Sequence, residues 1–172
     1  MSGDPRPVLP GAYWVIPERL LAGPYPGSWD EGRARERVRR VLDAGITVFL
    51  DLTEPGEMEP YAPLALAAAR ERRRTIRHIR LPIPDMTVPN PDYMTRILDT
   101  LDVALADGRT VYVHCLAGLG RTGTVIGCFL VRHGMSGQAA LNEIARLRGG
   151  ETDSPQTIDQ HRMVLHWHEG IA

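Results

Sequence analysis

The chain has 172 residues, of which 43% are hydrophobic and 24% charged, and its 20 basic and 21 acidic side chains leave a formal net charge of −1. A chain of this size can bury a core without disulfides or metal ions, which excludes disorder as its main state, and no apolar run approaches the length of a membrane span. The near-neutral charge argues against a general nucleic-acid-binding protein, and two cysteines are too few for a secreted disulfide framework.

The first half of the chain predicts short strands interleaved with helices. Apolar segments at 13–16 and 19–22 predict a hairpin, which Gly23 and the prolines after it end. Ser28 can cap the next helix, whose apolar side recurs at helical spacing until Gly45. The sequence then predicts a buried strand at 46–50, an Ala-rich helix at 61–74 and a strand at 76–83.

The second half predicts a helix, one more strand and three further helices, at residues 91–107, 110–114, 121–133, 136–147 and 154 to about 169. Because strands alternate with helices, we expect an α/β fold with a mostly parallel central sheet of about four to five strands and helices on both faces. No repeat or linker divides the sequence, so we expect a single domain over residues 1–172, with an irregular segment at 1–12. Ligands bind beyond the carboxyl ends of the strands in such sheets, and Cys115 directly follows one of them.

The segment around Cys115 has the pattern of an anion-binding nucleophile site. Arg121 and Thr122 follow Cys115 after five residues, between a strand end and a helix start. The two glycines of this turn let its backbone N–H groups face inward, and the helix start adds its positive end, so the hollow fits a tetrahedral dianion. A guanidinium can hold two phosphate oxygens, and the same positive field stabilises a thiolate. The five residues of the turn are Leu116, Ala117, Gly118, Leu119 and Gly120.

This His-Cys-x5-Arg-Thr segment resembles the signature of the cysteine-based protein tyrosine phosphatases, and Gly-Leu-Gly-Arg-Thr-Gly is similar to their dual-specificity branch. The order of elements resembles that family from about residue 13 to 160. The resemblance implies that Cys115 attacks phosphorus, that Arg121 and the five-residue turn bind the phosphoryl group, that Thr122 assists departure of the thiolate and that His114 orders the loop. It implies no cofactor and no metal.

Hydrolysis also needs an acid that protonates the leaving oxygen. Members of the family keep an aspartate on a loop about thirty residues before the cysteine, and Asp85 lies thirty residues before Cys115. Ile83-Pro84 stands where the tyrosine-specific branch has a Trp before that aspartate. Asp51, after the strand at 46–50, and Asp92 are the alternative acids.

The segment Pro155 to Gln160 resembles the glutamine loop of the tyrosine-specific branch, which orients the water that hydrolyses the cysteine-phosphate. Gln156 and Gln160 are the residues implied, although a solvated glutamine in a surface helix is the alternative interpretation. Cys128 lies in an apolar helix and is expected in the core, with a role as a resolving cysteine for oxidised Cys115 as the alternative.

Other clusters of polar side chains predict no chemistry of their own. The three histidines near the C-terminus do not share one helical face, so they predict no metal site; they are His161, His166 and His168. Six arginines form a basic run that we expect to be solvated, with an electropositive rim around the site as the alternative; they are Arg70, Arg72, Arg73, Arg74, Arg77 and Arg80.

The sequence therefore predicts a cytoplasmic, monomeric phosphomonoester hydrolase that forms a phosphocysteine intermediate. Phosphorylated protein or peptide is the expected substrate, with phosphotyrosine favoured over phosphoserine and phosphothreonine, and neither nucleic acid nor membrane is expected as a partner. Phosphoinositide-specific relatives carry Lys in the turn, whereas residues 116–120 are uncharged. The alternatives are a phosphoinositide or small-molecule phosphatase, a rhodanese-like sulfurtransferase and a phosphate-binding module without turnover. All basic residues are arginine, which indicates a GC-rich, bacterial source.

Overall fold

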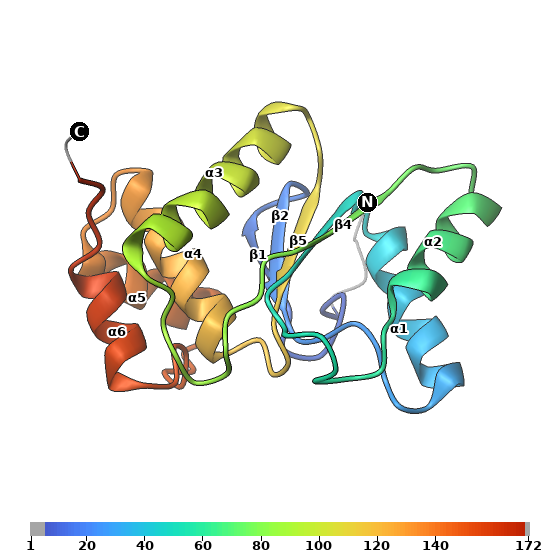
Figure 1. The fold of residues 1–172 in the computed structure, drawn as a ribbon, viewed down its shortest axis with the longest axis horizontal. Coiled ribbons are helices and arrows are strands. Elements are labelled where there is room, and N and C mark those ends of the chain that lie inside the picture. The colour runs from blue at the N-terminus through green and yellow to red at the C-terminus, as the bar shows by residue number, and fades with distance from the viewer. Residues whose placement is uncertain (1–5, 171–172) are drawn as a thin grey trace.

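The computed structural model describes residues 6–170, whose strands form one five-stranded sheet in the order β1-β2-β5-β3-β4 (Figure 1). Only β1 is antiparallel to its neighbour; β2, β5, β3 and β4 run parallel. The carboxyl ends of these four strands therefore meet at one edge of the sheet. The strands are β1 (Tyr13–Ile16), β2 (Leu20–Gly23), β3 (Val48–Asp51), β4 (Arg77–Arg80) and β5 (Val111–His114).

Helices cover both faces of the sheet, as the sequence predicts. One face is covered by α1 (Glu31–Asp43) and α2 (Ala62–Glu71) (Figure 1). Alternate strand residues build two cores: Phe49 packs toward α1 and α2, whereas Leu50 packs toward the other helices. The helices of the second face are α3 (Pro91–Ala106), α4 (Gly120–Arg132), α5 (Gly137–Leu147) and α6 (Ile158–Leu165).

The ends of several elements differ from the sequence predictions for local reasons. Asp30, rather than Ser28, caps α1 by accepting a hydrogen bond from the N–H of Arg33. The helix predicted over 61–74 stops at Glu71, and Arg73 adopts a positive φ of 54° just beyond it. Of the strand predicted over 76–83, only residues 77–80 form β4.

The last helix differs most from its predicted bounds of 154 to about 169. The Thr157 hydroxyl caps α6 by accepting a hydrogen bond from the backbone N–H of Gln160. The side-chain oxygen of Gln160 in turn accepts from the backbone N–H of Thr157, which completes a capping box. The segment 154–156 therefore stays outside the helix.

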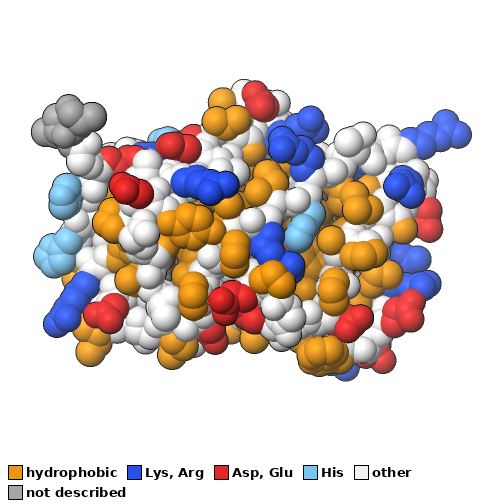
Figure 2. Space-filling view, in the orientation of Figure 1, with side chains coloured by type: hydrophobic (Ala, Val, Ile, Leu, Met, Phe, Trp, Pro, Cys, Tyr) orange, Lys and Arg blue, Asp and Glu red, His pale blue; other side chains and the backbone are white. Residues whose placement is uncertain are grey.

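Residues 6–12 contain neither helix nor strand, and the rest of the segment predicted as irregular, 1–5, lies outside the described residues. Hydrophobic, basic and acidic side chains are interspersed on the face in Figure 2. None of the helices within 6–170 has the length and apolar character needed to cross a bilayer.

Candidate active site

The loop after β5, residues 115–120, is here called the Cys115 loop. Cys115 is only 3% exposed, and its Sγ accepts a hydrogen bond from the N–H of Gly118 at 3.3 Å. Gly118 has a φ of +77°, and a Cβ on it would lie 2.5 Å from the carbonyl carbon of Gly23, so no larger residue fits. The N–H of Tyr25 donates to the carbonyl of Leu116 at 3.0 Å, which ties the loop after β2 to the Cys115 loop. The backbone thus curls around the sulfur with an N–H aimed at it.

Arg121, in the first turn of α4, is 1% exposed and held by several acceptors. Its two terminal nitrogens form a bidentate pair with the carboxylate of Glu57, at 2.6 and 2.9 Å. One of them also donates to the carbonyl of Ile83 at 3.0 Å, and the other lies 3.3 Å from Asp85 Oδ1. Six buried side-chain polar atoms of the described residues have no partner, and two of them lie together at the start of α4 beside Cys115: the Nε of Arg121 and the hydroxyl of Thr122. Buried polar groups rarely remain unpaired, so these two mark a place for a polar ligand.

Glu57 is the main site residue that the motif did not reveal. Burial alone would raise the pKa of its carboxyl, but the hydrogen bonds from Arg121 hold it below the ordinary value, so Glu57 is charged. It belongs to the loop that follows β3, the strand beside β5. An acidic loop at the carboxyl end of a neighbouring strand was the available signal.

The three aspartates considered as acids have different surroundings. Asp85 is 55% exposed at its side chain and is the one that reaches Arg121. Asp51 is fully buried, and its carboxylate binds Thr53 and, at 2.9 Å, His78 Nε2. Burial would raise the pKa of Asp51, but these hydrogen bonds keep it well below its usual range. Asp92 lies in the first turn of α3 and forms no ion pair with Arg121. Of the three aspartates, Asp85 is the one in contact with Arg121 beside the Cys115 loop.

His114, also fully buried, supports the loop from behind. Its Nδ1 lies 3.1 Å from the carbonyl oxygen of Cys115, and its Nε2 lies 2.6 Å from the hydroxyl of Tyr61. Because a carbonyl only accepts, Nδ1 carries the proton and Nε2 accepts from Tyr61. Burial lowers the pKa of His114 to about 4, so the ring is neutral near pH 7. Tyr61, which the sequence did not single out, thus fixes the ring orientation.

The two glutamines differ in burial and in hydrogen bonding. Gln160 is fully buried: its Oε1 accepts from the backbone N–H of Gln156 and Thr157, and its amide donates to the carbonyl of Thr87 at 3.3 Å. The Gln156 side chain is exposed and forms no hydrogen bond within the described part of the chain. Both amides lie against the Cys115 loop, since a Cβ on Gly120 would be 2.6 Å from Gln156 Oε1 and 3.0 Å from Gln160 Nε2, but within residues 6–170 only that of Gln156 is free of hydrogen bonds.

Two further observations complete the site. The hydroxyl of Ser154 donates to the carbonyl of Leu119 at 2.7 Å and so supports the Cys115 loop from the segment before α6. Cys128 is a buried core residue of α4, where burial raises the pKa of its thiol. Across residues 6–170, no cluster of His, Cys, Asp and Glu could hold a metal ion.

Comparisons with known proteins show the family and the fold of this chain. The family model for the Swiss Army Knife protein DSP-PTPase phosphatase domain matches residues 10–165. Over 157 residues the chain is 34% identical to the tyrosine-protein phosphatase CDC14 of Candida albicans, covering 91% of this chain and 28% of that protein. It is 31% identical to the phosphatidylglycerophosphate phosphatase PTPMT2 of Arabidopsis thaliana, covering 77% of this chain and 54% of that protein. The chain thus spans about a quarter to a half of these relatives.

Among solved structures, the active form of Tk-PTP superposes with a TM-score of 0.72 at 26% identity, covering 91% of this chain and 94% of that one.

Proposed function

Because the chain belongs to the DSP-PTPase phosphatase family, we propose that it hydrolyses phosphomonoesters through a phosphocysteine intermediate on Cys115. One observation carries the proposal: Arg121 is buried beside the Cys115 loop, held by Glu57 through its terminal nitrogens, while its Nε has no partner. A cation held in place in this way can stabilise the charge of a phosphoryl group during its transfer without having to reorient.

In the first step, the Cys115 thiolate attacks phosphorus and the bond from phosphorus to the ester oxygen breaks. The leaving oxygen takes a proton from Asp85, since an alkoxide or phenolate is a poor leaving group. The backbone N–H groups of the Cys115 loop, of which that of Gly118 points at the sulfur, hold the equatorial oxygens together with the Nε–H of Arg121, which has no partner among the described residues. The products of this step are the free alcohol or phenol and a phosphorylated cysteine.

In the second step, a water attacks phosphorus, the phosphorus–sulfur bond breaks and inorganic phosphate leaves. Asp85 takes the proton of the water, which restores its starting state. We assign orientation of this water to Gln156, because the amide of Gln160 is already hydrogen-bonded to the carbonyl of Thr87 and to the backbone N–H groups of Gln156 and Thr157. The Thr122 hydroxyl, buried and unpaired, assists departure of the thiolate.

We further propose a phosphorylated protein as substrate, with phosphotyrosine favoured. Residues 116–120 supply no charge for a second phosphate, and Leu116, which is 39% exposed, gives an aryl group an apolar neighbour. The second candidate is a phospholipid head group, which the similarity to a phosphatidylglycerophosphate phosphatase favours. Comparing kcat/KM for phosphotyrosine peptides and for phosphatidylglycerophosphate in mixed micelles separates the two.

The test of the chemistry uses p-nitrophenyl phosphate, rapid acid quenching and mass spectrometry. Wild-type enzyme quenched during turnover should carry one phosphate, located on Cys115. Cys115→Ser should abolish turnover yet still bind vanadate, because the loop N–H groups and Arg121 remain. Substantial turnover by a clean Cys115→Ser preparation would overturn the nucleophile assignment, and thiosulfate turnover without phosphatase activity would indicate a sulfurtransferase.

A further inference from the structure

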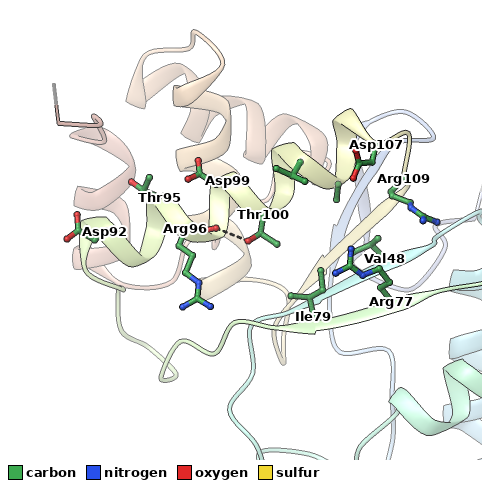
Figure 3. A pocket seen from close by; sticks show the side chains of 12 residues that line it. Val48, Arg77, Ile79, Asp92, Thr95, Arg96, Asp99, Thr100, Asp107 and Arg109 are labelled. Carbon is green, nitrogen blue, oxygen red and sulfur yellow. Dashed lines mark hydrogen bonds between the residues drawn. The ribbon is translucent and has the colours of Figure 1, made fainter. Parts of the chain in front are cut away.

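A groove of about 440 Å³ lies between α3 and the edge strand β4, apart from the Cys115 loop (Figure 3). Helix α3 packs toward β5 and leaves the face of β4 on its side partly uncovered. Val48 and Ile79 give this groove an apolar floor, and Val103 and Ala104 line it from α3. The groove combines these apolar side chains with charged ones.

Three arginines border the groove: Arg77 on β4, Arg96 on α3 and Arg109 just before β5. Within residues 6–170 their guanidinium groups form no ion pair and no hydrogen bond. Figure 3 shows Arg96 on the side of α3 that faces the strands, whereas Asp99 points away from them. Asp99 is 2.9 Å from Arg132 and so is already paired. Asp92, in the first turn of α3, and Asp107, at its C-cap, also line the groove. With Asp99 paired, the three arginines outnumber these two aspartates, so the groove keeps a small excess of positive charge over its apolar floor.

The basic run of the sequence divides between structural and free residues. Arg72 pairs with Asp43, Arg74 donates to the carbonyl of Leu42, and Arg80 donates to Asp51. Arg77 has no such partner and projects to the opposite face from Arg80, because strand side chains alternate. The expectation of a solvated run holds for the exposed Arg77 but not for these three bonded arginines.

Val48, Arg77 and Arg109 lie at or just before the amino ends of their strands, whereas the Cys115 loop follows a carboxyl end, so groove and catalytic loop are a strand length apart. The loop that carries Asp85 joins β4 to α3, so both walls of the groove lead to it. In the sheet, Arg80 on β4 pairs with Asp51 on β3, and Asp51 pairs with His114 on β5. Two strand spacings therefore separate the end of β4 from His114, a distance of roughly 10 Å. Arg77 lies three residues further back, roughly another 10 Å. An extended peptide needs about four to six residues to cover both distances.

We propose that this groove binds acidic residues of a protein substrate, about four to six residues from the phosphorylated residue. The inference rests on the proposed phosphoprotein substrate. Carboxylates suit the arginines because a guanidinium holds a carboxylate through two parallel hydrogen bonds, and the apolar floor accepts the methylene groups of glutamate. The groove thus adds sequence preference to a Cys115 loop that recognises a single phosphoryl group.

The test compares three phosphotyrosine peptides of equal length. One carries two Glu residues four to six positions before the phosphotyrosine, one carries them after it, and one has Gln at all these positions. Wild-type enzyme should prefer one Glu peptide over the Gln peptide by about tenfold in kcat/KM, mainly through KM, and the preference should shrink toward about 1 M salt. The double variant Arg77→Glu/Arg96→Glu should lose this preference while p-nitrophenyl phosphate and Gln-peptide turnover stay unchanged.

The control is Arg39→Glu, a charge reversal at an exposed arginine of α1 on the other face of the sheet. Equal kcat/KM for Glu and Gln peptides would overturn the groove proposal alone. So would an equal loss in Arg39→Glu, which would indicate net charge rather than a docked segment. Enzyme that hydrolyses p-nitrophenyl phosphate but none of the peptides would instead overturn the phosphoprotein substrate, and the groove proposal with it.

Discussion

His114 should make the stability of the fold depend on pH within a defined window. Burial lowers its pKa to about 4, whereas an imidazole in an unfolded chain titrates near about 6.5. Between these values the unfolded chain binds a proton that the folded protein does not, so the free energy of unfolding falls as the pH falls. From about pH 7.5 to about pH 5 these two pKa values give a loss of about 2 kcal/mol, and below the folded pKa the loss levels off.

Urea unfolding of wild type and His114→Asn across this pH range measures the effect. Asparagine keeps an N–H donor for the carbonyl of Cys115 but does not titrate, so the difference between the two curves isolates the imidazole. Asp51 lies 4.0 Å from His114 Nε2, but its own stabilisation is lost only at lower pH, because its folded pKa is lowered from an already acidic value. A difference that changes by less than about 0.5 kcal/mol across the range would refute the neutral, buried imidazole.

Three substitutions test the site itself. Asp85→Asn should lower kcat by about 10²–10⁴-fold for alkyl phosphates and much less for p-nitrophenyl phosphate; equal losses on both would remove its role as the acid. Glu57→Gln should lower kcat/KM by about tenfold or more, about 1.4 kcal/mol, because the guanidinium loses its charged partner, whereas Glu54→Gln in the same loop should not. Gly118→Ala should abolish vanadate binding and destabilise the fold more than Gly56→Ala, which shares the positive φ but meets no neighbour within 4 Å; equal unfolding free energies would contradict the clash.

The order of helices and strands is predictable because it depends on local patterns. The two valines and the tyrosine of β5 are residue types typical of strands, and the predicted strand at 110–114 differs from β5 by one residue. The start of α6 was harder to predict, because the spacing of apolar residues alone does not locate the residue that caps a helix. Thr157 and Gln160 nevertheless form a capping box, and that pair of residue types was the local signal for the true start.

The site was predictable only where its residues are neighbours in sequence. The motif from His114 to Thr122 is contiguous, and its spacing carries its chemistry. The supporting residues are far from their partners in the sequence: Glu57 is 64 residues from Arg121, Tyr61 is 53 from His114 and Ser154 is 35 from Leu119. Each acts by holding another side chain or a carbonyl. Such supporting contacts leave no fixed spacing in one sequence, so only the fold reveals them.

The turn that carries Asp85 is fastened at both ends. On one side the N–H of Ile83 bonds to the carbonyl of Leu52, and on the other the carbonyl of Thr87 accepts from Gln160. Inside the turn, the N–H and hydroxyl of Thr87 both bond to the carbonyl of Pro84. With the backbone of the turn held, movement of Asp85 is left to its carboxylate, which accepts from the N–H of Met86 and lies 3.3 Å from Arg121. Exposed side chains change rotamer within picoseconds to nanoseconds. Proton delivery should therefore keep pace with any chemistry at Cys115 without waiting for a slow lid.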